Sequence, residues 1–298
     1  MFIPKRILEK KLHDFLKEDV GQGDLTTYLT VPEGTIVQAK VLVKESGVVA
    51  GIEEALILCE SLGLQAEALA SDGAQVKPET SILRIVGDAR TILSAERTLL
   101  NMLSRMSGIA TVTRHLTNEV RAAGYKTRIA CTRKVAPGLN YFDKKAVSIG
   151  GGDTHRLHLD DLILLKDNHI QIVGSIGDAI RKTREVVSFS KKIEVEVTSV
   201  EEALEAAKVG ADIIMLDNLS PAEIENVVSQ LQKESVRENV LLEASGEITG
   251  NNVVDYAATG IDVVSLGKIT HSVKALDASL EIVKVVEKDN SRSSPQKK

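Results

Sequence analysis

Four different polar side chains follow an aliphatic stretch at residues 161–170, which read Asp-Leu-Ile-Leu-Leu-Lys-Asp-Asn-His-Ile. Lys166, Asp167, Asn168 and His169 supply a cation, an acid, an amide and an imidazole at consecutive positions. An ammonium group can hold an anionic substrate or leaving group, and an imidazole can hold or transfer a proton. The stretch therefore predicts a buried strand that carries chemically active groups at its C-terminal end.

The same pairing of an aliphatic run with a polar end recurs in the second part of the chain. Aliphatic runs occur at residues 128–131, 162–165, 193–197, 213–216, 240–242 and 263–266. The polar residues that end or follow them are Arg133 and Lys134, Lys166, Glu196, Asp217 and Asn218, Glu243 and Ser245, and Gly267 and Lys268. A single charge after a strand is usually a solvated loop residue. Six successive strands with such ends indicate one shared site.

The charges are sorted along the chain in a way that suggests what this site binds. The earlier units contribute Arg133, Lys134, His155, Arg156 and Lys166. The later units contribute Glu196, Asp217 and Glu243, and Glu194 shares one strand face with Glu196, where buried carboxylates need partners or a metal. Guanidinium groups bind carboxylates and phosphates, and carboxylates together with substrate phosphates hold Mg²⁺. The pattern predicts a Mg²⁺-assisted enzyme whose small substrates carry carboxylates and phosphates.

Glycines after the last two runs suit phosphate binding. Ser245 and Gly246 follow the fifth run, and Gly267 follows the sixth. Barrels often bind phosphate after their last strands, through backbone N–H groups that glycine lets a ligand approach. By contrast, the segment 21–27 (Gly-Gln-Gly-Asp-Leu-Thr-Thr) follows no strand and lacks Gly-Lys-Ser/Thr. We interpret that segment as a structured turn and not as a phosphate loop.

Alternating strands and helices must position these polar ends. The stretch 199–210 predicts a helix between two runs, with a capping box formed by Ser199 and Glu202 and a stop at Gly210. Strands that alternate with helices through short connections form a parallel sheet. About six such units favour a barrel closed on itself over an open sheet.

The first 110 residues have a different character. They predict a helix at 4–16, strands at 36–43 and 81–86, and a helix at 91–107 that stops at Gly108. This order indicates a separate mixed α and β region. At the other end of the chain, residues 289–298 are polar and predict a disordered tail.

Composition argues against several other classes of protein. The chain has 298 residues, 43% of them hydrophobic and 27% charged, which suffices for a substantial core. A net charge of −5 and 3% aromatic residues without Trp argue against a nucleic-acid partner. No apolar run reaches the roughly 20 residues of a membrane helix and no signal peptide is recognisable, so we expect a cytoplasmic protein without a membrane partner. Cys59 and Cys131 are expected to be buried thiols.

Taken in chain order, the motifs resemble those of the quinolinate phosphoribosyltransferase family. They are Thr132-Arg-Lys134, Pro137-Gly-Leu139, Gly150-Gly-Gly152 with His155-Arg156, Leu165-Lys-Asp-Asn-His169, Glu194-Val-Glu196, Met215-Leu-Asp-Asn218, Leu242-Glu-Ala-Ser-Gly246 and Ser265-Leu-Gly267. The resemblance runs from about Asp19 to His271. It implies an N-terminal α/β sandwich domain (1–112), joined by the C-terminal segment 272–288, and an incomplete (β/α) barrel (113–271).

The resemblance also implies a reaction. Members of the family transfer a phosphoribosyl group from phosphoribosyl pyrophosphate (PRPP) to quinolinate, release CO₂, and make nicotinate mononucleotide for NAD synthesis. By this resemblance the quinolinate carboxylates contact Arg133, His155 and Arg156, with Thr132 in the same substrate site. Lys134 and Lys166 would lie near both the quinolinate and the sugar phosphates.

The remaining roles follow from the same resemblance. Glu196 and Asp217 would lie near the ribose and Mg²⁺, and Ser245, Gly246 and Gly267 near the 5′-phosphate. The expected catalytic groups are Lys134, Lys166, Glu196 and Asp217. Arg97 matches an arginine that in the family enters the site of the neighbouring subunit, which implies a homodimer or a hexamer built from dimers.

The chain departs from the common family pattern near the expected carboxylate site, at Val135, Ala136, Asn140 and Thr154. These departures bear on which pyridine acid is preferred. Two other classes of function stay open: a Schiff-base aldolase with Lys134 or Lys166 as nucleophile, and a metabolite sensor that binds without turnover. A sister group associated with molybdenum transport ranks lower, because it usually lacks the Lys-Asp-Asn-His stretch present at 166–169.

Overall fold

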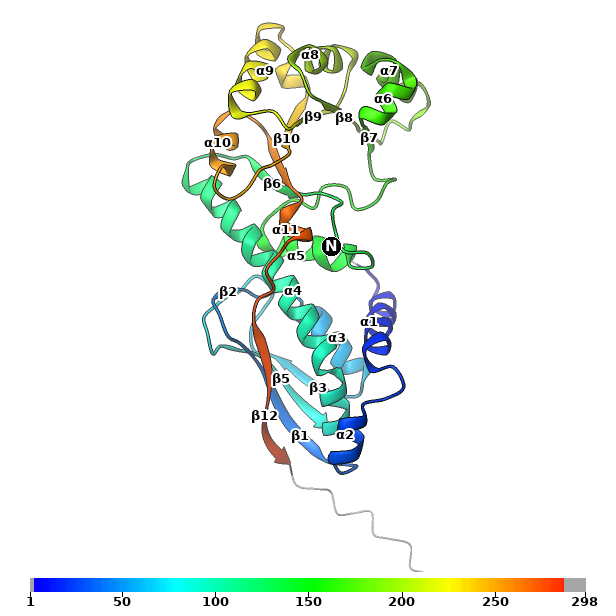
Figure 1. Cartoon of the computed structure of the whole chain (residues 1–298), viewed down its shortest axis with the longest axis vertical. Helices are drawn as coiled ribbons and strands as arrows, with labels where there is room; N and C mark the ends of the chain where they lie inside the picture. Colours follow the sequence, from blue (N-terminus) through cyan, green and yellow to red (C-terminus); the bar gives the residue numbers. More distant parts are fainter. Residues whose placement is uncertain (1–2, 287–298) are drawn as a thin grey trace, which may run out of the picture. The chain divides into compact units, whose positions relative to one another are not determined.

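The computed structural model describes residues 3–286, which form two compact units (Figure 1). The first unit comprises Met1–Thr111 and Lys274–Lys298, and the second comprises Val112–Val273. The division falls within the long helix α4 (Ala89–Ala122). The expected tail at 289–298 and the end of the segment 272–288 lie outside the described residues.

An antiparallel sheet organises the first unit. Its strand order is β12-β1-β5-β3, with bounds β1 (Ile36–Val43), β3 (Gln65–Ala68), β5 (Ser81–Asp88) and β12 (Ala278–Val286). In β1 every second residue is buried until the strand reaches a fully buried end, which is the pattern of a strand with one face on a core. The other elements are α1 (Lys5–Val20), α2 (Leu25–Thr30), β2 (Gly47–Val48), α3 (Ile52–Ser61) and β4 (Gln75–Val76).

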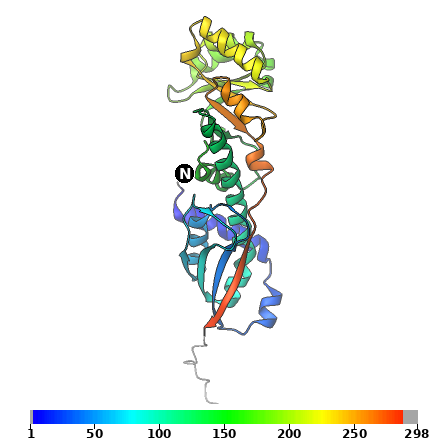
Figure 2. The same cartoon turned by 90° about the vertical axis from the view of Figure 1, so that its left-hand side faces the viewer.

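Strand β12 comes from the far end of the chain. It pairs antiparallel with β1, with Val43 opposite Ala278 at one end and Ile36 opposite Val286 at the other. Figure 2 shows the two strands side by side. Residues that follow the second unit in the sequence thus complete the sheet of the first.

The expected helix stop at Gly108 is wrong, because α4 continues to Ala122. A Cβ at Gly108 would lie 2.2 Å from the carbonyl oxygen of Lys274. Close to this contact, the N–H of Leu276 donates to the carbonyl oxygen of Ser104 at 2.9 Å. The glycine therefore marks a close approach of two backbone segments and not the end of a helix.

The segment 21–27 is a turn that leads into α2. Gly21 and Gly23 have φ values of 58° and 132°. The Asp24 carboxylate accepts the N–H of Thr27 at 3.0 Å and caps the helix. The interpretation as a structured turn is confirmed.

Six parallel strands form the sheet of the second unit, in the order β6-β11-β10-β9-β8-β7. Their bounds are β6 (Arg128–Cys131), β7 (Ile163–Leu165), β8 (Ile193–Val197), β9 (Ile213–Asp217), β10 (Leu241–Ser245) and β11 (Val263–Leu266). The helical elements are α5 (Asn140–Gly150), α6 (Asp167–Val173), α7 (Ile176–Val186), α8 (Val200–Val209), α9 (Pro221–Lys233), η1 (Arg237–Asn239), α10 (Val253–Ala258) and α11 (Lys268–His271). Each of the six aliphatic runs overlaps one strand, so the predicted strands are confirmed.

The expected closure of the barrel is wrong. Within residues 3–286, β6 and β7 are edge strands and do not pair with each other. The place beside β6 is taken by the segment after α5, where Asp153 bridges to Ala130 and its N–H donates to the carbonyl oxygen of Ile129 at 2.7 Å. The fold is therefore an incomplete (β/α) barrel with an N-terminal mixed α/β unit, as the family resemblance implies.

The capping box predicted at the start of α8 is only partly correct. The Ser199 hydroxyl accepts the N–H of Glu202 at 3.2 Å, and Gly210 ends the helix with a φ of 96°. The Glu202 carboxylate, however, accepts the N–H of Thr198 at 2.8 Å and not that of Ser199. The helix begins and ends where the sequence predicts, but the capping box is half formed.

Both cysteines are buried and unpaired, as expected. Burial raises the pKa of Cys59 to about 12, which keeps this thiol protonated and unreactive. A search of the described helices finds none that combines the length and the apolarity of a membrane span.

Candidate active site

The C-terminal ends of the parallel strands border a cavity of 590 Å³ in the second unit. The predicted residues that line it are Thr132, Arg133, Lys134, His155, Arg156, Lys166, Glu196, Asp217, Ser245, Gly246 and Gly267. The site residues that the family resemblance implies in this unit therefore come together, whereas Asp167, Asn168 and His169, which follow Lys166, are not among the lining residues. Arg97, the remaining residue that the resemblance implies, lies on α4 in the first unit, where it is exposed.

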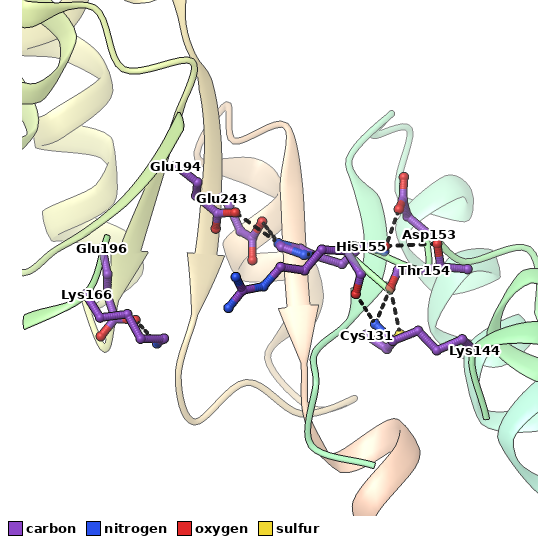
Figure 3. Close-up of polar contacts among 10 residues, drawn as sticks. Cys131, Lys144, Asp153, Thr154, His155, Lys166, Glu194, Glu196 and Glu243 are labelled. Atoms are coloured by element: carbon purple, nitrogen blue, oxygen red, sulfur yellow. Dashed lines mark hydrogen bonds and ion pairs between the residues drawn. The ribbon is translucent and has the colours of Figure 1, made fainter. Parts of the chain in front are cut away.

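Lys166 stands between β7 and α6. Its backbone N–H donates to Nδ1 of His169 at 3.0 Å, so this imidazole supports the start of the helix. Its ammonium group forms a close ion pair with Glu196 on the neighbouring strand β8 (Figure 3). The Lys166 side chain remains 43% exposed. A cation and an anion thus stand side by side at the cavity wall.

A second carboxylate belongs to Asp217, at the end of β9. The Asn218 amide donates to it at 2.7 Å. Burial, followed by the charge of Glu196, raises the pKa of Asp217, although Lys166 and Lys134 act in the opposite direction. The two carboxylates therefore repel each other, and a cation bound beside them would relieve that repulsion.

His155 is held by two buried carboxyl groups, as Figure 3 shows. Its Nε2 lies 3.1 Å from Oε2 of Glu243 and 3.4 Å from Oε2 of Glu194. Burial alone lowers the pKa of His155, but hydrogen bonds and charges from both glutamates outweigh it and raise the pKa to about 10. The two carboxyl groups therefore favour the protonated form of His155, while its Nδ1 faces the backbone N–H of Arg156 at 2.7 Å.

Glu194 has a shifted pKa in this cluster. Burial raises the pKa of Glu194, and the nearby charge of Glu243 adds to the effect, while His155 opposes it. The cluster places one imidazole between two buried carboxyl groups. The partner that the sequence requires for Glu194 is thus His155, and for Glu196 it is Lys166.

The raised pKa of His155 predicts a pH-dependent contribution to stability. A group whose pKa is raised by folding stabilises the fold fully below its unfolded value and loses this effect as pH rises through its folded value. The free energy of unfolding of the wild type, minus that of His155→Gln, should therefore fall between pH 6.5 and about 10. Urea unfolding at a series of pH values measures this difference.

The exposed His158 provides a matched control from the same loop. His158→Gln should leave the free energy of unfolding almost unchanged across the same pH range, because the exposed side chain makes no contact comparable to the two buried carboxyl groups beside His155. A difference between wild type and His155→Gln that stays constant from pH 6 to 10 would contradict the raised pKa of His155.

Two glycines shape the cavity after the last two strands. Gly246 has a φ of 134°, and a Cβ there would lie 2.6 Å from Oδ1 and 3.0 Å from Cα of Asn218. A Cβ at Gly267 would lie 2.8 Å from Cδ of Lys134. Larger residues would strain the backbone or displace side chains of the site. The glycines therefore allow Asn218 and Lys134 to pack close to the backbone at the cavity.

A second hollow, of 750 Å³, lies in the first unit, but its lining is unlike that of a catalytic site. Aliphatic residues such as Ile52, Leu56 and Leu69 form most of it. Two of its charged residues, Lys5 and Glu60, pair with each other at 2.7 Å. The converging charges of the second unit make its smaller cavity the better candidate.

The cavity also contains polar residues to which the sequence analysis gave no individual role. Asn218 and Lys268 follow predicted strands, so the strand-end pattern already contained them, whereas His271 carried no such signal. Val135, Ala136, Asn140 and Thr154, the four departures from the family pattern, are not among the lining residues. These four residues can influence the shape of the cavity only through neighbouring residues that line it.

Comparison with known proteins agrees with this geometry. The model of "Quinolinate phosphoribosyl transferase, N-terminal domain" matches residues 24–107, and that of the C-terminal domain matches residues 109–281. A probable nicotinate-nucleotide pyrophosphorylase (carboxylating) of Methanothermobacter thermautotrophicus is 47% identical over 91% of this chain and 97% of its own. The nicotinate-nucleotide pyrophosphorylase (carboxylating) of Rattus norvegicus is 34% identical over 94% of this chain and 92% of its own.

A solved structure points in the same direction. The nicotinate-nucleotide pyrophosphorylase from Francisella tularensis superposes with a TM-score of 0.86 at 38% identity, covering 94% of this chain and 98% of its own. Sequence and structure agree over both units, and most of the motifs that carry the likeness contribute at least one residue to the cavity lining. The chain therefore belongs to the quinolinate phosphoribosyl transferase family.

Proposed function

We propose that this protein is a nicotinate-nucleotide pyrophosphorylase of the carboxylating type. It transfers the phosphoribosyl group of PRPP to quinolinate, releases pyrophosphate and CO₂, and supplies nicotinate mononucleotide to NAD biosynthesis. The observation that carries the proposal is the composition of one cavity, which combines cations suited to a dicarboxylate with carboxylates and glycine turns suited to PRPP. The reaction belongs to the cytoplasm in this proposal.

Quinolinate binds to the cationic part of the cavity. Arg133, His155 and Arg156 hold its two carboxylates, with the Thr132 hydroxyl and Lys134 beside them. Burial, together with the charge of Arg133, lowers the pKa of Arg156, so the two guanidinium groups repel each other. A bound dicarboxylate would offset that repulsion and accept paired hydrogen bonds from the guanidinium groups.

PRPP binds to the other part, where Ser245, Gly246 and Gly267 accommodate the 5′-phosphate. Glu196 and Asp217 fit Mg²⁺, because they are neighbouring oxygen donors, and burial followed by the charge of Glu196 raises the pKa of Asp217. Mg²⁺, when bound through them directly or through water, supplies charge neutralisation for the pyrophosphate.

Transfer begins as the bond between ribose C1′ and the pyrophosphate oxygen breaks. Glu196 and Asp217 stabilise the positive charge that develops on the ribose, while Lys134 and Lys166 stabilise the departing pyrophosphate. The pyridine nitrogen forms a bond to C1′ and becomes cationic. The adjacent carboxylate then leaves as CO₂, its electron pair stays on the ring carbon beside the cationic nitrogen, and a proton adds at that carbon.

The active assembly is a homodimer or a hexamer built from dimers. In this proposal the exposed Arg97 of one subunit reaches the cavity of its neighbour and adds a further cation for the substrate carboxylates. A site completed by two subunits would make association necessary for activity.

An assay of the purified protein tests the function. With Mg²⁺ and PRPP present, we expect nicotinate mononucleotide and CO₂ from quinolinate and no nucleotide from nicotinate. Product from nicotinate alone would contradict the proposal and indicate a salvage enzyme. Failure with both acids would favour the aldolase or the sensor, and trapping of a borohydride-stable adduct on Lys134 or Lys166 would distinguish the aldolase.

A further inference from the structure

Lys144 is a buried lysine of α5 whose ammonium group contacts main-chain oxygen atoms (Figure 3). Its Nζ donates to the carbonyl oxygens of Thr154 at 2.5 Å and Arg156 at 2.8 Å, and it also contacts the thiol of Cys131. The residue is 0% exposed. Within the described part of the chain, these partners include no carboxylate. Burying an ammonium group without a counter-ion is costly, so its position calls for an explanation.

The two carbonyl groups that Lys144 binds flank His155 in the chain. Because both converge on one ammonium group, the backbone must turn between them. His155 has a φ of 51° at this turn, a left-handed conformation that is uncommon for a residue with a side chain. Asp153 supports the same turn, since its carboxylate accepts the N–H of His155 at 2.8 Å.

The helix that carries Lys144 is itself anchored. The Arg114 guanidinium of α4 donates to the carbonyl oxygens of Ile149 and Gly150, both at 2.9 Å. These contacts fix the C-terminal end of α5, two turns beyond Lys144. The Lys144 ammonium group therefore has a fixed position, and its two hydrogen bonds hold the turn at 154–156 in place.

We propose that Lys144 is a positioning residue for recognition of the pyridine dicarboxylate, and the inference rests on the proposed function. Lys144 does not line the cavity, whereas His155 and Arg156 do. By holding the carbonyl groups on both sides of His155, it directs the imidazole toward Glu194 and Glu243 and fixes the backbone from which Arg156 reaches the cavity. It thus acts on substrate through the turn.

The proposed role of Lys144 predicts different effects on the binding of the two substrates. The turn at 154–156 carries cations proposed for the dicarboxylate, while the groups proposed for PRPP lie at or after the C-terminal ends of the strands β6 to β11 and not on this turn. A loosened turn should therefore weaken binding of quinolinate and leave binding of PRPP nearly unchanged. A residue that merely stabilised the fold would not distinguish the two.

Lys144→Met tests the proposal, because methionine has a similar length and no hydrogen-bond donor. We expect KM for quinolinate to rise by about 10-fold or more, with KM for PRPP within about 3-fold of the wild type. Equal changes in both constants, or no change in either, would overturn the proposal. Circular dichroism and thermal unfolding establish whether the variant is folded.

Ser148→Ala is the matched control, because Ser148 lies on the same helix as Lys144 and is exposed, away from the turn at 154–156. It should leave KM for quinolinate within about 3-fold of the wild type, and a rise equal to that of Lys144→Met would overturn the assignment of a specific role. If Lys144→Met fails to fold, Lys144→Gln takes its place, because glutamine retains a donor for one carbonyl group. Its KM values for quinolinate and PRPP are then compared in the same way. Failure of both variants to fold would assign Lys144 to general stability and overturn the proposal.

The wild-type assay separates this inference from the proposed function. If the wild type turns over quinolinate but Lys144→Met changes KM for quinolinate and KM for PRPP equally, only the positioning role would be contradicted. Absence of turnover by the wild type would contradict the function on which it rests.

Discussion

Replacing Lys166 with alanine should lower kcat by on the order of 10²- to 10³-fold, because the charge that stabilises the departing pyrophosphate is lost in the transition state. The ammonium group pairs with Glu196 and borders the cavity. Its removal also leaves Glu196 without this cation, which should alter the charge beside the ribose. Steady-state kinetics with saturating quinolinate and PRPP measure the effect.

Lys182→Ala is the control for this prediction. Lys182 is an exposed lysine of α7 in the same unit, so it matches the change in charge without touching the cavity. It should retain wild-type kcat. A folded Lys166→Ala protein with wild-type kcat would refute the role assigned to Lys166, and a borohydride-stable adduct on wild-type Lys166 would replace it with that of a nucleophile.

Mixing two inactive variants should restore activity if Arg97 acts in the neighbouring subunit. In a hybrid dimer of Arg97→Ala and Lys166→Ala subunits, one site keeps both Lys166 and the partner's Arg97, while the other site lacks both. Random exchange makes half of the dimers hybrids, so about one quarter of all sites should be active. Activity measured after exchange, against each variant alone, gives this fraction.

A mixture of Lys166→Ala with Lys134→Ala is the matched control. Both lysines line the cavity of a single subunit, so every hybrid site would lack one of them. This mixture should stay inactive. If differently tagged subunits exchange, as shown by mass spectrometry, and the Arg97→Ala mixture still recovers no activity, Arg97 is not shared between subunits.

Much of the site could be predicted because it depends on a general rule of parallel α/β architecture. Aliphatic runs at regular intervals predict parallel strands, and the C-terminal ends of such strands meet at one face. Arg133, Lys166, Glu196 and Asp217 come from four different strand ends and line the same cavity. Local pattern was sufficient here because chain order and spatial order are closely related in this fold.

The errors arise where two distant segments meet. Gly108 was predicted to end a helix, but its missing side chain accommodates the backbone near Lys274. The barrel was predicted to close, but the segment around Asp153 occupies the edge of β6. Neither contact leaves a trace in the periodicity of either segment, because periodicity reports burial of one face and not the identity of the neighbour.

By itself, the sequence determined the strands of the second unit, the groups at their ends and the family to which the chain belongs. Only the tertiary structure decided that His155 lies between two glutamates that raise its pKa to about 10, and that Lys144 is buried with its hydrogen bonds on the turn at 154–156. In the sequence, Lys144 looks like an ordinary solvated lysine of a helix. Its burial and its carbonyl partners depend on how α5 packs against residues 151–156, and the pKa of His155 depends on strands far along the chain. Such effects follow from distances and dielectric surroundings, which exist only once the chain has folded.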